Sequence, residues 1–207
     1  MAETHRGRLG VISGPSGSGK TSICKALASD PRVFFSVSAT TRPKRPGEVD
    51  GRDYWFLPEE KFRAMADQGK FLEWALYNGR YYGTPREPVE RALSEGKVVL
   101  LEIELQGATR LRRDGVEGVY IFLEPPSLEA LEARLRRRGT ESEEEIRKRL
   151  EIAREEWRQA REGKVYDYFV VNDDLARAEK EVRDLLGIPK EEGSREAREE
   201  GREEGKG

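Results

Sequence analysis

The chain has 207 residues, a formal net charge of −2 and a single cysteine, Cys24. This length supports one compact domain with small insertions, and the near-zero charge gives no basic field that would attract nucleic acid or an anionic membrane. A single cysteine excludes an internal disulfide, and no signal-peptide core or run of about 18 apolar residues is present, so we expect a soluble cytoplasmic protein without a membrane partner.

The first predicted element is a buried strand over residues 9–13, followed by a glycine-rich loop and a helix over residues 21–29. The loop consists of Gly14, Pro15, Ser16, Gly17, Ser18, Gly19, Lys20 and Thr21. It fits the phosphate-binding pattern G-x-x-x-x-G-K-[ST], in which the lysine contacts the β- and γ-phosphates and the final hydroxyl is a ligand for Mg²⁺. A plain glycine-rich turn is the alternative. The placement of the loop between a strand and a helix favours binding of a nucleoside triphosphate.

Residues 35–96 contain short aromatic and β-branched runs separated by turn residues, which indicates a small, mainly antiparallel insertion. The runs lie at residues 34–38, 53–56, 71–75 and 80–83. Residues 40–48 form a turn-rich loop with three positive charges, and a lone basic loop is usually solvated surface. Beside a phosphate loop, however, Arg42 and Arg45 are candidates for a clamp on a second phosphate group, and Tyr54 and Tyr82 would add hydroxyl donors.

Apolar runs at residues 98–101, 119–123 and 169–171 predict further strands, and helices are predicted at 106–113, after residue 127, and at 142–162. The last helix begins with a capping-box pattern, Ser142-x-x-Glu145. Strands that alternate with helices predict an α/β fold with a parallel sheet whose ligands bind at the carboxyl ends of the strands. Glu102 and Glu104 follow one of these strands on the same face, where carboxylates commonly organise Mg²⁺ and its water ligands.

Several segments follow one another in the order and spacing found in guanylate kinases. They are the phosphate loop and residues 35–42, 47–54, 71–74, 81–84, 138–140 and 171–174. The resemblance runs from residue 9 to residue 186. Guanylate kinases transfer the γ-phosphate of ATP to GMP in purine nucleotide metabolism, so the resemblance implies this reaction, with dGMP as a second acceptor. It also implies a P-loop NTPase-type parallel sheet flanked by helices, a GMP-binding insertion and a helical lid.

The resemblance further implies roles for individual side chains. The implied GMP-binding residues are Ser38, Arg42, Arg45, Tyr54, Glu73, Tyr82, Thr84 and Glu104. The implied ATP-binding residues are those of the phosphate loop, Gly14 to Thr21, together with Asn172 near the adenine. The implied catalytic residues are Lys20, Arg42, Arg134, Arg138 and Arg149. Mg²⁺ would be held by Thr21 and, through water, by Glu102.

Glu73 suits its implied role chemically, because a carboxylate accepts from guanine N1–H and N2–H₂ together and adenine offers no such pair. A site built on buried polar groups rejects a mismatched base by about 10⁴-fold. A strand carboxylate that faces water is the alternative. The family usually carries Asp at the position of Glu104, and often at Glu102, so these side chains are one methylene longer while the charge is retained.

The expected organisation has a core formed by residues 8–34, 97–125 and 164–187. The GMP-binding insertion spans 35–96, and the lid with its flanking helices spans 126–163. Residues 1–7 and the Glu/Arg/Gly-rich residues 188–207 are expected to be disordered. A monomer and a homo-oligomer both remain open.

Two alternatives accompany the resemblance. Scaffold proteins carry guanylate-kinase-like domains that bind peptides without catalysis, but these typically have a degraded phosphate loop. A related class phosphorylates ribose 1,5-bisphosphate and has no use for the guanine-reading residues Ser38, Glu73 and Thr84.

Overall fold

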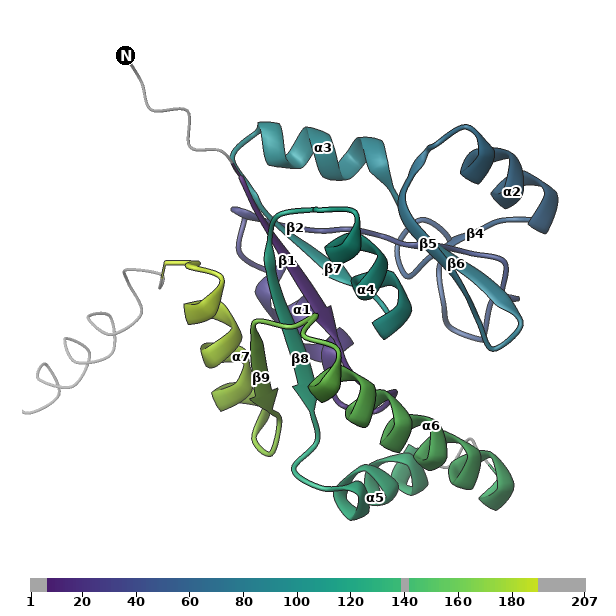
Figure 1. Ribbon diagram of the computed structural model, residues 1–207, viewed down its shortest axis with the longest axis vertical. Helices are drawn as coiled ribbons and strands as arrows, with labels where there is room; N and C mark the ends of the chain where they lie inside the picture. Colours follow the sequence, from purple (N-terminus) through teal and green to yellow (C-terminus); the bar gives the residue numbers. More distant parts are fainter. Residues whose placement is uncertain (1–6, 139–141, 190–207) are drawn as a thin grey trace, which may run out of the picture.

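The computed structural model describes residues 7–138 and 142–189, and only the backbone of Arg138. Its centre is a five-stranded parallel sheet with the order β2-β7-β1-β8-β9 (Figure 1). The strands are β1 (Arg8–Ser13), β2 (Val33–Phe35), β7 (Val98–Glu102), β8 (Val119–Glu124) and β9 (Tyr168–Val171). The predicted α/β class is confirmed. Because β1 lies in the middle, the loop that leaves its carboxyl end is flanked by the ends of β7 and β8.

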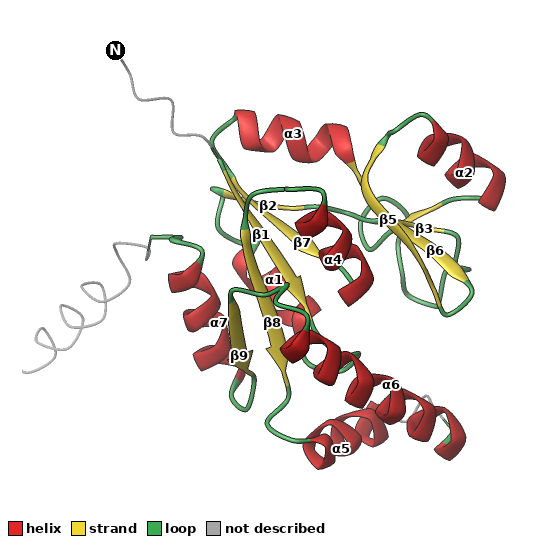
Figure 2. Cartoon of the chain, in the orientation of Figure 1, coloured by secondary structure: helices red, strands yellow, loops and turns green. Residues whose placement is uncertain are grey.

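Helices cover both faces of this sheet (Figure 2). On one face α1 (Lys20–Leu27) and α7 (Leu175–Leu185) pack over a buried cluster that includes Ile12 and Cys24. On the other face α3 (Arg86–Ser94) and α4 (Leu105–Arg113) pack over a cluster that includes Val11. Neighbouring residues of β1 therefore enter opposite cores, as expected for a strand covered on both sides. Burial raises the pKa of the Cys24 thiol well above its usual value.

The insertion forms a second, four-stranded sheet with the order β4-β3-β6-β5, in which β6 is antiparallel to both of its neighbours. Its strands are β3 (Ala39–Thr40), β4 (Trp55–Phe56), β5 (Phe71–Tyr77) and β6 (Arg80–Pro85). Helix α2 (Glu59–Asp67) packs on this sheet through Phe62, whose ring stacks against Phe71 at a centroid distance of 4.4 Å.

Two details of the predicted insertion are wrong. The strand at Val33–Phe35 pairs with β7 and belongs to the central sheet, so the run at 34–38 is not one strand of the insertion. Helices α2 and α3 also lie within residues 35–96, for which only strands were predicted. Both helices follow a proline, Pro58 and Pro85, which is a favourable residue at the start of a helix.

The segment 126–163 forms a pair of helices, α5 (Leu128–Arg138) and α6 (Glu143–Glu162). Leu131 and Leu135 of α5 pack against Ile146 and Ala153 of α6. The predicted capping box is confirmed, because the Ser142 hydroxyl accepts from the Glu145 N–H and the Glu145 carboxylate accepts from the Ser142 N–H. This helix pair projects from the central sheet near the carboxyl end of β8 (Figure 1).

The structured part of the chain extends slightly further than predicted. The Gly7 N–H donates to the Leu93 carbonyl, and Ile188 is only 3% exposed within the core, so neither residue belongs to a disordered end. The remaining residues of the two predicted ends, 1–6 and 190–207, lie outside the described residues. Among residues 7–138 and 142–189, no helix has the length and apolar content needed to cross a membrane.

Candidate functional site

The loop between β1 and α1 has the backbone geometry of a phosphate cradle. Gly14, Gly17 and Gly19 have φ values of 148°, 95° and 100°, in the region that favours glycine. A Cβ at Gly14 would lie 2.0 Å from the Leu123 carbonyl oxygen, so the loop packs directly on the end of β8. Lys20 is 7% exposed, and its Nζ donates to the carbonyl oxygens of Gly14 and Pro15 at 2.5 and 3.1 Å. The ammonium group is therefore held inside the curve of the loop.

Oxygen ligands suited to Mg²⁺ lie beside this loop. The Thr21 hydroxyl donates to Glu102 Oε1 at 2.6 Å, which brings together the two residues predicted to hold the metal. Hydroxyl, carboxylate and water oxygens are the ligands that Mg²⁺ prefers, so the residues present fit this ion. Among the described residues, no group of three or more His, Cys, Asp or Glu side chains is arranged to hold a metal by itself.

A pocket opens between the second sheet and the carboxyl end of β7. Among its lining residues are Ser38, Tyr54, Glu73, Tyr82, Glu104 and Gly107. Five of the predicted GMP-binding residues thus line one pocket, whereas Arg42, Arg45 and Thr84 are not among its lining residues. Burial raises the pKa of the Glu104 carboxyl, Lys20 opposes this shift, and Glu102 adds to it. Lys20 belongs to the phosphate loop and Glu104 lines the pocket, so the loop and the pocket interact electrostatically.

Glu73, which lines the pocket, forms a buried polar pair with Thr84. Glu73 is 4% exposed and Thr84 is fully buried, and the Thr84 hydroxyl donates to Glu73 Oε1 at 2.7 Å. Burial raises the pKa of Glu73 to about 7, against the opposing effects of Thr84 and Arg110. The second oxygen, Oε2, faces Gly107, where a Cβ would lie only 2.6 Å away. A glycine in α4 is therefore required for this orientation of the carboxylate, and no sequence pattern pointed to it.

The predicted phosphate clamp is built around an acidic partner. Arg42 donates through Nη1 and Nη2 to Glu48 Oε2 and Oε1 at 3.0 and 2.8 Å, and its guanidinium lies 5.3 Å from the centre of the Tyr54 ring. Glu48 also accepts from the Arg45 N–H at 2.7 Å. Hydrogen bonding to Glu48 raises the pKa of Arg42. Glu48 was not predicted as a site residue, although an acidic residue within a basic loop indicates an ion pair with one of the arginines. The Arg45 side chain is exposed.

The lid helices bring one predicted arginine to the phosphate loop and a second to Asn172, the residue beside the loop. Arg149 Nη1 donates to the Ser16 hydroxyl at 3.0 Å, and Arg134 Nη2 donates to the Asn172 carbonyl oxygen at 2.6 Å. The Asn172 side chain, 4% exposed, in turn donates to the Ser18 carbonyl oxygen at 2.7 Å. The side chain of Arg138, also predicted to be catalytic, lies outside the described residues.

Comparison with known proteins decides the family. A family model described as guanylate kinase matches residues 6–188. The chain belongs to the guanylate kinase family. It is 50% identical to a guanylate kinase of Symbiobacterium thermophilum, covering 90% of this chain and 87% of the relative. It is 52% identical to one of Thermus thermophilus, covering 88% of this chain and 80% of the relative. A crystal structure of guanylate kinase from Anaplasma phagocytophilum is 32% identical, with a TM-score of 0.71, and covers 88% of this chain and 86% of that chain.

In this guanylate kinase family member, the predicted residues therefore form two adjoining groups. One surrounds the phosphate loop and includes Lys20, Thr21, Glu102 and Arg149. The other consists of Ser38, Tyr54, Glu73, Tyr82 and Glu104, which line the pocket. Asn172 was predicted near the adenine, and the structure places its side chain against the backbone of the phosphate loop. Its role toward adenine stays a prediction.

Proposed function

We propose that the chain transfers the γ-phosphate of ATP to GMP and dGMP, giving ADP and GDP or dGDP, with the residues described above in the roles predicted for them. The observation that carries this proposal is the buried carboxylate of Glu73, which accepts from the Thr84 hydroxyl and lines a pocket beside a complete phosphate loop. A carboxylate at the base of the pocket accepts from guanine N1–H and N2–H₂, and this pairing is unavailable to adenine. The membership of the guanylate kinase family supports the same acceptor.

The GMP phosphate is assigned to Arg42, Arg45, Tyr54 and Tyr82. A phosphate has the same planar pairs of oxygen acceptors as the Glu48 carboxylate that Arg42 now binds. Glu48 occupies Nη1 and Nη2 and fixes the guanidinium beside Tyr54, so a phosphate bound to this edge would replace the carboxylate. We assign Ser38 and Glu104 to the guanosine side of the same pocket, because both line it.

ATP is assigned to the phosphate loop, with Lys20 at the β- and γ-phosphates. Thr21 and, through water, Glu102 would hold Mg²⁺, which when bound neutralises charge on the phosphates. Arg149 donates to Ser16 of the loop, and Arg134 donates to the carbonyl oxygen of Asn172, whose side chain binds the loop. We assign both arginines to the negative charge that develops on the transferred group. Arg138 is assigned the same role from sequence alone.

The reaction needs no general base from the protein. An oxygen of the GMP phosphate is already a nucleophile, so the chain contributes by positioning and by electrostatic stabilisation. The insertion and the lid lie on either side of the phosphate loop (Figure 1), so movement of both toward it would exclude water from the transferred phosphoryl group.

The test is an ADP-release assay with ATP and Mg²⁺, offering GMP, dGMP, AMP, UMP and ribose 1,5-bisphosphate separately. Turnover restricted to GMP and dGMP is expected. Turnover with ribose 1,5-bisphosphate alone would contradict the assigned acceptor, and measurable GMP binding without turnover would indicate a binding module. Lys20→Ala is expected to lower kcat by about 10³-fold or more with GMP affinity retained, whereas Lys61→Ala, on the exposed surface of α2, keeps full activity.

A further inference from the structure

Strand β5, which carries Glu73, lies at the edge of the second sheet and pairs there with β6 alone. An edge strand has a strand partner on one side only, so its other side depends on contacts with other parts of the chain. The register of β5 against β6 also shifts between Phe71 and Glu73, which is an irregularity immediately before the carboxylate of the pocket. The contacts that hold β5 from outside its sheet therefore bear directly on the position of Glu73.

Two arginines of the neighbouring helices bind backbone carbonyl groups of β5. Arg86, the first residue of α3, donates through Nη2 to the Phe71 carbonyl oxygen at 3.2 Å. Arg110 of α4 donates through Nη1 to the Trp74 carbonyl oxygen at 3.2 Å. These two hydrogen bonds lie on either side of Glu73 along the strand, and the bond from Arg110 is made to the residue directly after it.

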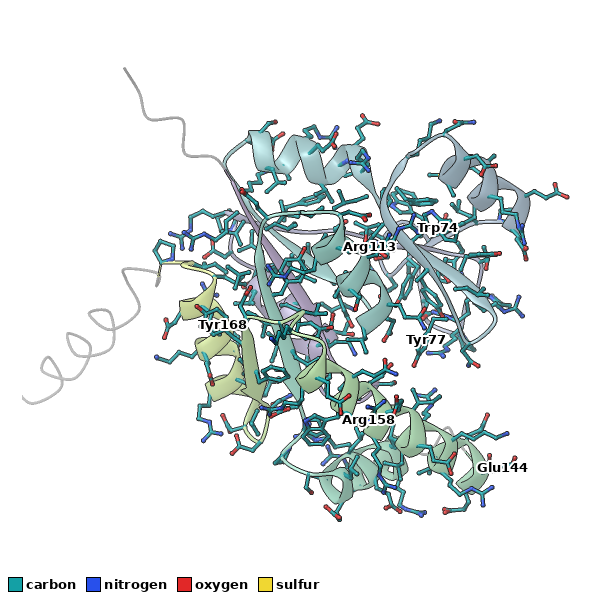
Figure 3. All side chains as sticks on the ribbon, viewed as in Figure 1. Trp74, Tyr77, Arg113, Glu144, Arg158 and Tyr168 are labelled. Atoms are coloured by element: carbon teal, nitrogen blue, oxygen red, sulfur yellow. The ribbon has the colours of Figure 1, made fainter. Side chains whose placement is uncertain are left out.

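Arg110 also stacks on the side chain of Trp74. Its guanidinium carbon lies 5.0 Å from the centre of the Trp74 ring, which is the geometry of a cation–π contact. Figure 3 shows Trp74 at the side of the second sheet that faces α4, and its side chain packs against the buried cluster of the insertion that contains Phe62. Arg110 thus binds both the backbone and the ring of the residue next to Glu73, and it connects α4 to the interior of the insertion.

The same face of α4 makes room for the Glu73 side chain. Gly107 lies three residues before Arg110, which places both residues on one face of the helix, and a Cβ at Gly107 would lie 2.6 Å from Glu73 Oε2. The positive charge of Arg110 also opposes the rise in the pKa of Glu73 that burial causes. Helix α4 therefore receives the carboxylate at one position and holds the strand that carries it about one turn later.

We propose that Arg110 is a specificity-determining positioning residue, which fixes β5 so that the Glu73 carboxylate reaches both N1–H and the 2-amino group of guanine. A carboxylate accepts from both donors only when it lies close to the plane of the base, and a small displacement of β5 removes one of the two bonds. The hydrogen bond and the stacking contact at Trp74 oppose this displacement. The inference rests on the proposed function, because it concerns the residue assigned to guanine, and Arg110 itself is assigned to neither substrate.

Arg110 has one further partner, Asp114 at the end of α4. The Nε–Oδ2 distance is 3.9 Å and both side chains are partly exposed, so this ion pair contributes little to stability. Arg113, which is also on α4, lies 3.2 Å from the same carboxylate, and its side chain is 73% exposed. Arg113→Met is therefore the matched control for Arg110→Met, because it removes an arginine from the same helix and the same acidic partner.

The test compares GMP with IMP, which lacks the 2-amino group of guanine. The measured quantity is the ratio of kcat/KM for GMP to kcat/KM for IMP. Methionine at position 110 keeps an apolar stem beside Trp74 and removes the guanidinium, so the ratio is expected to fall about 10-fold in Arg110→Met, with the KM for ATP unchanged within about 2-fold. Arg110→Lys keeps the charge and one donor, and its ratio is expected to lie between those of the wild type and Arg110→Met. Arg113→Met is expected to match the wild type.

A role of Arg110 in stability alone predicts a different result. Arg110→Met would then have a lowered Tm and an unchanged ratio for GMP and IMP, and this result would overturn the proposal. An equal fall of the ratio in Arg113→Met would overturn it as well, because the effect would then arise from Asp114 or from α4 as a whole.

A binding measurement separates this inference from the proposed function. Calorimetry gives the affinities for GMP and IMP without phosphoryl transfer, and the ratio of the two affinities is expected to fall about 10-fold in Arg110→Met. A wild type that prefers GMP to IMP in binding but does not phosphorylate it, with the preference reduced in Arg110→Met, would contradict the proposed function alone. A wild type that phosphorylates GMP in preference to IMP, with the same preference in Arg110→Met, would contradict the inference alone.

Discussion

The missing side chain of Gly107 makes room for the carboxylate of Glu73, because a Cβ at position 107 would lie 2.6 Å from Glu73 Oε2. Gly107→Ala is therefore expected to turn or displace the carboxylate and to raise the KM for GMP by about 10-fold or more, since a group built to pair with guanine is then misaligned. The KM for ATP is expected to stay within 2-fold. Gln106→Ala, at the exposed neighbouring position of α4, is the control and should match the wild type. An unchanged KM for GMP in Gly107→Ala would show that Glu73 does not contact the base.

The pKa of Glu73, raised to about 7 by burial, predicts a pH dependence of base binding. Pairing with guanine N1–H and N2–H₂ needs the carboxylate, so binding displaces the proton that the free acid holds below pH 7. Affinity is expected to rise with pH through about 7 and to level off above it. Guanosine is the ligand of choice for calorimetry, because it carries no phosphate that titrates in the same range. Glu73→Gln is expected to bind weakly and without this pH dependence.

The same pKa shift predicts an effect on stability. The folded-state pKa of Glu73 lies above its ordinary value of 4.5, so between pH 4.5 and 7 the folded state binds more protons than the unfolded state. Stability from this group is therefore present at low pH and decreases as the pH rises through this window. Glu73→Gln is expected to have a higher Tm than the wild type at pH 8, with a smaller difference at pH 5. An equal or lower Tm at pH 8 would contradict the cost of the buried charge.

The bidentate pair between Arg42 and Glu48 predicts that lysine cannot replace Arg42. A lysine ammonium lacks the planar pair of donors, so Arg42→Lys is expected to raise the KM for GMP about 10- to 100-fold. The affinity for guanosine should stay unchanged, because the assigned contact is to the phosphate. Lys44→Ala, in the same exposed loop, serves as the control. Equal losses for GMP and guanosine would mean that Arg42 supports the shape of the pocket and does not bind the phosphate.

Asn172 supports the phosphate loop through its bond to the Ser18 carbonyl oxygen at 2.7 Å. Asn172→Ala removes a buried hydrogen bond and is expected to lower the free energy of unfolding by about 1–3 kcal/mol and to reduce kcat. Chemical denaturation and steady-state kinetics measure the two effects. ATP and GTP are also compared as phosphate donors. A changed ratio of their kcat/KM values in Asn172→Ala would support the adenine contact predicted from the sequence, and an unchanged ratio would confine Asn172 to support of the loop.

The parts of the fold that could be predicted from sequence have local signals. The phosphate loop, the strand before it and the helix after it lie within about 20 consecutive residues and fit a pattern with few alternatives. The start of α6 was predicted from Ser142 and Glu145, which form the capping box in the structure. Helix α2 has no such signal, because Phe62 is its single buried residue and the apolar stripe is too thin to outweigh the strands around it.

The residues of the candidate site also differ in whether the sequence around them carries a local signal. Arg42, Glu73 and Lys20 lie in recognisable segments, so the resemblance identified them. Gly107 gains its significance from Glu73, a residue far away in the chain. The residues before and after Gly107 carry no pattern that distinguishes them from an ordinary helix. Only the three-dimensional packing of α4 against β5 brings this pair together.

Cys24, the single cysteine of the chain, is fully buried beneath the central sheet, and its thiol resists ionisation. Maleimide reagents require an accessible thiolate, so the native protein should remain unlabelled under mild conditions. Cysteines introduced at Glu144 on the lid and at Arg80 on the insertion, both exposed, would then be the sole reactive positions. A donor and acceptor dye at these positions would follow the distance between lid and insertion in single molecules, without first removing any native residue.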